Sequence, residues 1–245
     1  MPPLATWMAW FALPSLLSIA ATYLLLRWLS ARYLRGPLAD PAQSPLTPTG
    51  RLSLWGIGVF AVVLLGSSAA GVELGAPAFF TAAALIAGVA WKDRQAPSAV
   101  ARGVAWSVIP LVAGLFIIVE ALNGAGARQL SQSALALAAG LPPLGSVLSC
   151  AFGTALLSNL INNLPAGLIS GEALRAAHAP MLLKGAVMIG IDLGPNLSIT
   201  GSLATILWLI AIRREGTEIG FWQFLKWGLI LMPPALLLAA GALVL

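Results

Sequence analysis

Charged residues, cysteine and histidine are all scarce in this chain, and each scarcity excludes a class of protein or site. Only 9% of the 245 residues are Asp, Glu, Lys or Arg, whereas soluble domains carry about 25%. A single cysteine, Cys150, excludes an internal disulfide and any metal site built from several cysteines. A single histidine, His178, forms no metal site alone. The sequence therefore implies neither a soluble domain nor a bound metal or cofactor.

Apolar residues dominate instead, at 59% of the chain. Uncharged runs of about 18 residues or more recur, which is the length that a helix needs to cross a bilayer. A membrane barrel would show weak alternation over segments of about ten residues. We therefore predict an all-α polytopic membrane protein with about six transmembrane helices, one of them broken, plus one re-entrant helical hairpin.

The net charge of +5 does not indicate nucleic-acid binding. The basic residues punctuate apolar runs instead of forming one soluble patch, which is the pattern that orients membrane proteins. An enzyme is also disfavoured, because no serine–histidine or paired-carboxylate arrangement is visible. We expect a multi-pass protein of the cytoplasmic (inner) membrane that contacts lipid and no nucleic acid.

The apolar runs and the polar breaks between them divide the chain into seven segments. The N-terminal run lacks a basic leader and is as long as a span, so we predict a retained helix rather than a signal peptide. The predicted segments are a lead transmembrane helix (1–35), a Pro-rich cytoplasmic linker (36–51), three scaffold transmembrane helices (52–122), an outer loop with a short helix (123–143), the re-entrant hairpin (144–172), a broken transmembrane helix (180–212), and an interfacial helix with the last transmembrane helix (215–245).

The hairpin assignment rests on arm length and on charge. Its arms, Leu144–Ser158 and Asn163–Gly171, have about 15 and 9 residues, so at 1.5 Å per residue each reaches only part of a roughly 30 Å core. An outward-facing hairpin also leaves three basic residues outside (Arg128, Arg175, Lys184) and ten inside (Arg27, Arg32, Arg35, Arg51, Lys92, Arg94, Arg102, Arg213, Arg214, Lys226). This distribution obeys the positive-inside rule and places the C-terminus on the outer face.

Two apolar stretches are interrupted near their middle by polar, helix-breaking residues. The first break runs from Ser158 to Pro165 and the second from Asp192 to Asn196. Lipid cannot satisfy unpaired backbone groups, so such breaks occur at membrane depth only inside protein or beside a wet cavity. Hydrophobic segments broken by Gly and Pro are the best sequence indication of the solute site in a secondary transporter.

Polar residues in the two breaks are the candidate substrate-binding set. Amides and hydroxyls can both donate and accept, which suits a small neutral solute with several hydroxyl groups. The alternative is that they cap exposed helix ends. We expect the second half-helix to begin near Asn196, with Ser198 and Ser202 on one face and Thr200 pointing elsewhere. The set is Ser158, Asn159, Asn162, Asn163, Asn196, Ser198 and Ser202, with Pro165, Gly194 and Pro195 shaping the breaks.

Asp192 is a lone carboxylate in an otherwise apolar half-helix. An ionised carboxylate is costly in a dry environment, so it must be neutral or have a partner. Beside a binding pocket it could exchange a proton for solute, which makes it the candidate proton-coupling residue. The alternative is an Asp that bonds backbone at the break or pairs with a basic residue. Cys150 is read as a small packing residue.

The residues around both breaks resemble a known family. Leu157–Leu168 and Gly190–Thr205 closely resemble the two signature regions of the arsenical pump membrane protein (ArsB) family, within the ion transporter superfamily. The resemblance continues through Arg213–Gly216 and Met232–Pro234. It implies an exporter of arsenite and antimonite in exchange for protons, which gives arsenic resistance, acting alone or with a soluble arsenite-stimulated ATPase.

The resemblance covers only part of such a protein. The resemblance implies a protein that contains two inverted repeats, each with a hairpin and a broken helix. This chain resembles the C-terminal half of such a protein plus one preceding helix. An N-terminal half or a homo-oligomer is therefore an implied partner. The alternatives that stay open are a carboxylate or other anion symporter of the same superfamily, and a non-transporting membrane anchor for the ATPase.

Overall fold

The computed structural model describes residues 4–31, 47–92, 94 and 96–245, and all the regular structure in these ranges is helical. The chain divides into two units, which are described separately: Met1–Met8 with Pro37–Val108, and Ala9–Gly36 with Ile109–Leu245. Most of the predicted cytoplasmic linker, 36–51, lies outside the described residues. The helical, multi-span class predicted from the sequence is confirmed.

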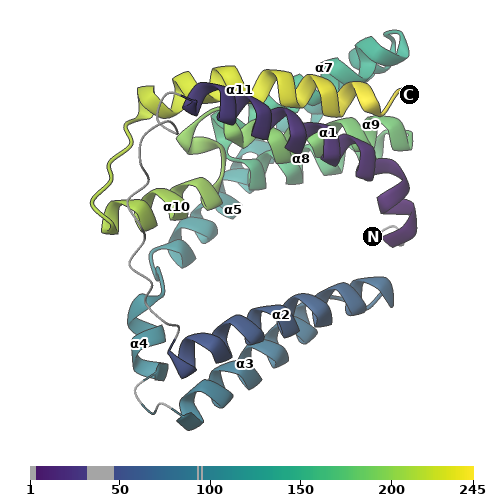
Figure 1. Cartoon of the computed structure of the whole chain (residues 1–245). Coiled ribbons are helices and arrows are strands. Elements are labelled where there is room, and N and C mark those ends of the chain that lie inside the picture. The colour runs from purple at the N-terminus through teal and green to yellow at the C-terminus, as the bar shows by residue number, and fades with distance from the viewer. Residues whose placement is uncertain (1–3, 32–46, 93, 95) are drawn as a thin grey trace. The chain divides into compact units, whose positions relative to one another are not determined.

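The first unit contains α2 (Pro48–Ala69), α3 (Gly75–Lys92) and the short α4 (Ala96–Gly103). Thr47 caps α2, because its side-chain oxygen accepts a bond from the N–H of Gly50 at 3.0 Å. The chain reverses at Gly71, whose φ of 72° suits glycine, and α3 then packs along α2 (Figure 1). Helix α4 ends at Gly103, so the last of the three scaffold helices predicted over 52–122 begins only at Val108.

The second unit contains most of α1 (Leu4–Ser30) and the helices that follow α4 (Figure 1). The helices α5 (Val108–Gly124) and α6 (Ala127–Ala139) meet at a 73° bend. The remaining elements are α7 (Pro143–Ile161), α8 (Asn163–Ala176), α9 (Met181–Leu193), the 3-10 turns η2 (Gly194–Asn196) and η3 (Ile199–Gly201), α10 (Leu203–Arg214) and α11 (Phe221–Ala242).

Helix lengths refine the predicted layout. Within the described residues, α1, α2, α7 and α11 are each long and apolar enough to cross a membrane, and the bent pair α5–α6 adds a fifth candidate. Helix α7 has 19 residues and α8 has 14, so both hairpin arms are longer than expected, and the re-entrant assignment stays a prediction. The expected interfacial helix is not a separate element, because Phe221–Lys226 are the first residues of the continuous helix α11.

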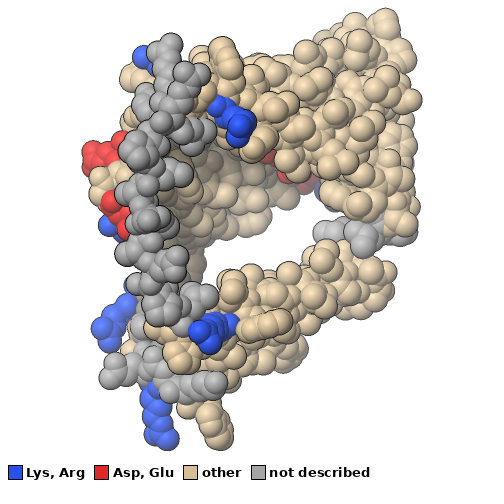
Figure 2. Space-filling model, in the orientation of Figure 1, with Lys and Arg blue, Asp and Glu red and all other residues tan. Residues whose placement is uncertain are grey.

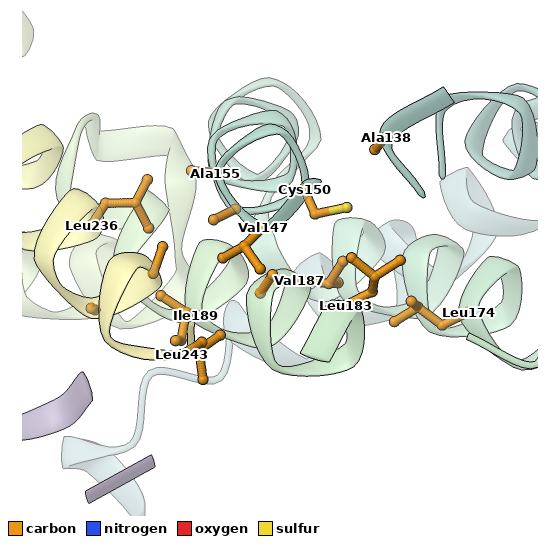
Figure 3. Packing of buried hydrophobic residues seen from close by; sticks show 14 of the residues in the cluster. Ala138, Val147, Cys150, Ala155, Leu174, Leu183, Val187, Ile189, Leu236 and Leu243 are labelled. Carbon is orange, nitrogen blue, oxygen red and sulfur yellow. The ribbon is translucent and has the colours of Figure 1, made fainter. Parts of the chain in front are cut away.

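The core of the second unit lies where α7, α9 and α11 pack together (Figure 3). Val147 and Ala151 on α7, Ala186 on α9 and Leu236 on α11 are fully excluded from solvent. Small residues allow helices in membranes to approach closely, where van der Waals contact replaces the missing hydrophobic drive. On the face shown in Figure 2, most of the described surface carries no charged side chain, as expected for a surface that meets lipid.

Candidate functional site

The two polar breaks come together because α7 and α9 approach each other closely. Gly194, at the end of α9, lies against Ala155 of α7, where a Cβ would come within 2.5 Å of the Ala155 Cα. Thr154 fills the next position along the contact, and its Oγ1 donates to the carbonyl oxygen of Cys150 at 2.7 Å. The contact therefore sets Gly194, in the second break, against Ala155, which lies six residues before the end of α7.

In the structure the second break extends over residues 194–202, which we call the crossover. It contains η2 and η3, and extended backbone precedes and follows η3. Ser198 and Ser202 have φ of −140° and −147° with ψ of 160° and 146°. Pro195 lies within η2, where its missing N–H prevents a continuous helix. Helix α10 consequently begins at Leu203 and not near Asn196 as predicted. The expectation that Ser198 and Ser202 share a helix face is wrong for the same reason.

Asn159 connects the hairpin tip to the crossover. Its Nδ2 donates to the carbonyl oxygen of Gly194 at 2.8 Å and to that of Ala155 at 2.7 Å. Its Oδ1 accepts from the Ser198 Oγ at 2.7 Å. All of these partners are groups of the protein itself. In this structure the Asn159 amide therefore bonds backbone groups near the helix ends, which is the role that we gave above as the alternative to solute binding.

Asn162 makes a second connection from the junction of α7 and α8. Its φ of 75° and ψ of 151° fall in a region that residues with side chains seldom adopt. The Oδ1 accepts from the N–H of Leu164 at 3.2 Å, and the Nδ2 donates to the carbonyl oxygen of Thr200 at 3.2 Å. These two bonds hold the one-residue reversal in place, and one of them depends on the crossover.

Thr200 completes the network, although we expected it to point elsewhere. Its Oγ1 donates to the carbonyl oxygen of Asn159 at 3.0 Å and lies 3.0 Å from the Ser198 Oγ. Gly201 allows this approach, since a Cβ there would lie 2.8 Å from the Asn159 Oδ1. The roles of Thr200 and Gly201 could not be predicted from helical spacing, because the crossover is not a continuous helix. Their only sequence signal was their place beside the Pro-containing break.

Three other predicted residues bond or pack within the helix to which they belong. Ser158 is fully buried and donates to the carbonyl oxygen of Thr154 at 2.9 Å. Ser202 is the N-cap of α10, because its Oγ accepts from the N–H of Ala204 at 3.1 Å. Pro165 lies in the first turn of α8 and is fully buried. These three residues shape the break rather than offer free polar groups.

Three predicted residues that are close to the network in sequence keep uncommitted side chains in the described part of the chain. Asp192 is exposed in the last turn of α9, Asn196 is exposed in the crossover, and Asn163 is half-buried at the start of α8. None of the three side chains makes a hydrogen bond or ion pair with any residue in the described ranges. Asp192 lies two residues before Gly194, so a carboxylate stands next to the network without belonging to it.

Helix α11 closes the crossover from another side. Its Gly228 is buried, and a Cβ there would lie 2.7 Å from the carbonyl oxygen of Asn196. The crossover backbone is therefore held between α7 and α11 (Figure 1). Chemically, the site offers amides, hydroxyls and one carboxylate, and the described residues contain no cluster of His, Cys, Asp and Glu that could hold a metal ion.

The chain matches a known protein family but no solved structure. The family model described as "Arsenical pump membrane protein" (ArsB) matches residues 8–245. Proteins named "Arsenical pump membrane protein" from Yersinia enterocolitica and from Escherichia coli strain K12 are each 31% identical over 150 residues. A "46 kDa membrane protein" of Mycobacterium leprae is 31% identical over 134 residues, which are 51% of this chain and 31% of that protein. No solved structure matches the chain.

The match with the two arsenical pump membrane proteins is partial in both directions. The aligned 150 residues make up 60% of this chain and 35% of each relative. The chain therefore corresponds to about a third of the length of the curated relatives it matches.

Proposed function

Because the chain belongs to the arsenical pump membrane protein family (ArsB), we propose that it is a secondary-transport module that exports arsenite and antimonite in exchange for protons across the cytoplasmic membrane. The observation that carries the proposal is the meeting of two polar helix breaks in one network, built from Asn159, Asn162, Ser198 and Thr200. Asn162 and Ser198 are buried in this network, and buried polar side chains between apolar helices are expensive and usually functional. Half-helix ends of this kind form the solute pockets of secondary transporters.

The solute chemistry fits what the network offers. Trivalent arsenic and antimony are neutral trihydroxy species in water, and their hydroxyl groups can donate to and accept from amides and from a hydroxyl such as that of Ser198. Asn163 and Asn196 carry uncommitted amides beside the network, so they can bond solute without breaking a protein contact. We assign these two amides and the Ser198 hydroxyl to solute binding.

The network also constrains how the module moves. Asn159 and Asn162 each donate one bond to a carbonyl oxygen of the crossover, and Ser198 and Thr200 each donate one bond to Asn159. Opening the hairpin tip alone would break all of them. We therefore assign alternating access to a movement of α7, α8, α9 and the crossover as one body, with the solute carried at the breaks.

Asp192 is the residue to which we assign proton coupling. It is the acidic residue nearest the network in sequence and has no partner in the described part of the chain. An unpaired carboxylate that faces lipid has a high free-energy cost. We therefore expect Asp192 to face a water-filled route or to be covered by another element of the transporter. Protonation on one side of the membrane and release on the other would then alternate with solute binding.

Replacing Asp192 by asparagine tests this assignment. In everted vesicles, Asp192→Asn is expected to abolish arsenite uptake driven by an acidic interior, to the level of vesicles without the protein, because asparagine cannot exchange a proton. Radiolabelled arsenite uptake at several imposed pH gradients measures it. Asp192→Glu should retain coupling, and Glu218→Gln, in the exposed segment before α11, should not alter it.

Two outcomes contradict the proposal in different ways. Full pH-driven uptake by Asp192→Asn would remove Asp192 from coupling and leave transport standing. No arsenite export by the unaltered chain, in cells lacking their own exporter and supplied with or without an N-terminal half, would overturn the transport function itself. The same cells report whether a homo-oligomer or a soluble arsenite-stimulated ATPase is required.

A further inference from the structure

A groove separate from the polar network lies between α6, α7 and α8. Its volume is about 630 Å³. No charged side chain of the described residues lines it, and the polar groups in it are four hydroxyls and one thiol, from Ser131, Ser149, Thr154, Ser170 and Cys150. The hydroxyl of Thr154 is already bonded to backbone. The groove therefore lacks the convergent polar groups that a hydroxylated solute needs.

The groove has a buried floor and an apolar, exposed rim. Leu135, Ala173 and Val187 at its floor are 8%, 2% and 4% exposed. Leu130 and Leu137 of α6, which also line it, are 73% and 78% exposed. In a membrane, such leucines meet hydrocarbon, so an alkyl chain can enter the groove from the bilayer past an apolar rim.

One end of the groove carries an excess of positive charge. Arg128 at the start of α6 pairs with Glu172 near the end of α8, with Nη2 and Oε2 2.9 Å apart. This is a charge contact, because the Glu172 Oε2 has no aligned hydrogen bond in the described residues. Arg175 lies nearly one turn beyond Glu172 and is exposed. Leu130 and Leu174 line the groove; Arg128 is two residues before the first and Arg175 follows the second directly in the chain. We therefore infer that both arginines lie near this end of the groove.

We propose that this groove binds one acyl chain of an anionic phospholipid, whose phosphate is held by Arg128 and Arg175. The separation of an uncharged apolar groove from a cationic end matches the separation of tail and headgroup in a phospholipid. Guanidinium groups bind phosphate through paired N–H donors, and the Arg128 side chain is 52% exposed, so it can do so while it contacts Glu172. The site is independent of the solute network.

Two glycines provide a matched pair of variants. Gly153 lines the groove and a Cβ there would meet no atom within 4 Å, so Gly153→Leu places an alkyl side chain into the groove. Gly171 on α8 also faces open space but does not line the groove, so Gly171→Leu is the control. Both replacements put a better helix former in a helix interior.

The test is native mass spectrometry of the full chain, released from nanodiscs that contain phosphatidylglycerol and phosphatidylcholine in equal amounts. The unaltered chain and Gly171→Leu are expected to retain one phosphatidylglycerol, and Gly153→Leu to retain about tenfold less. The double variant Arg128→Gln, Arg175→Gln is expected to retain both lipids equally. It decides the question if Gly153→Leu does not fold.

Several results would overturn the proposal. They are no retained lipid on the unaltered chain, equal retention by Gly153→Leu, or an unchanged preference for phosphatidylglycerol in the double arginine variant. A lipid-free dimer that Gly153→Leu disrupts would mean that a second copy covers the groove, and would overturn it as well.

Discussion

Asn159→Ala is expected to separate the hairpin tip from the crossover and to abolish arsenite transport. The Gly194 carbonyl oxygen and the Ser198 hydroxyl would each lose their bond to Asn159. Each keeps one other partner, because the Leu197 N–H also bonds the Gly194 carbonyl oxygen and Thr200 Oγ1 lies 3.0 Å from the Ser198 Oγ. The variant removes the three bonds of the Asn159 side chain, and hydrogen bonds within membranes average about 0.6 kcal/mol. We therefore expect the free energy of unfolding to fall by about 2 kcal/mol, measured by unfolding in mixed detergent micelles.

Asn163→Ala is the matched control for that measurement. Asn163 is also an amide at the hairpin tip, but its side chain has no partner in the described residues. Its replacement should change the free energy of unfolding by no more than about 0.5 kcal/mol, while it weakens arsenite binding if the amide contacts solute. Equal destabilisation by both variants would show that Asn159 does not connect the two breaks.

The positions of both breaks were predictable because they depend on local chemistry. Helix α7 ends at Ile161, three residues beyond the predicted Ser158, α8 begins at Asn163 as predicted, and α9 ends at Leu193, inside the predicted second break. Proline removes a backbone donor, and Asn and Ser bond nearby backbone groups in competition with helix. These effects act over a few residues, so the sequence contains them directly.

The start of the second half-helix was not predictable in the same way. Ser198 and Thr200 bond Asn159, which lies 39 and 41 residues earlier in the chain. These bonds hold the crossover extended and delay α10 to Leu203. Our prediction from helical spacing assumed that the helix resumes directly after Pro195. An extended crossover is favourable only because α9 packs on α7 and brings Asn159 within reach of it.

The use of the asparagines also depended on tertiary packing. From the sequence, the solute-binding and capping readings of Asn159 and Asn162 were both open. The structure fills their hydrogen-bonding groups with protein partners, whereas the side chains of Asn163, Asn196 and Asp192 have no partner among the residues that the structure describes. In the proposed transporter, the first pair positions the breaks and the other three residues face the solute or the proton.

Gly194→Ala is expected to destabilise the whole second unit, because the two breaks meet only if α7 and α9 can touch. The added methyl carbon would lie 2.5 Å from the Cα and 2.8 Å from the carbonyl oxygen of Ala155, and backbone atoms cannot rotate away as a flexible side chain can. Overpacking of this kind costs about 1–3 kcal/mol or more. The measurement is the yield of monodisperse protein and its melting temperature in detergent, and both should fall. Gly241→Ala in α11, where an added Cβ meets no atom within 4 Å, should behave like the unaltered chain. Recovery of Gly194→Ala at unaltered yield and melting temperature would mean that α9 can move away from α7 at little cost, and the one-body movement proposed for transport would lose its basis.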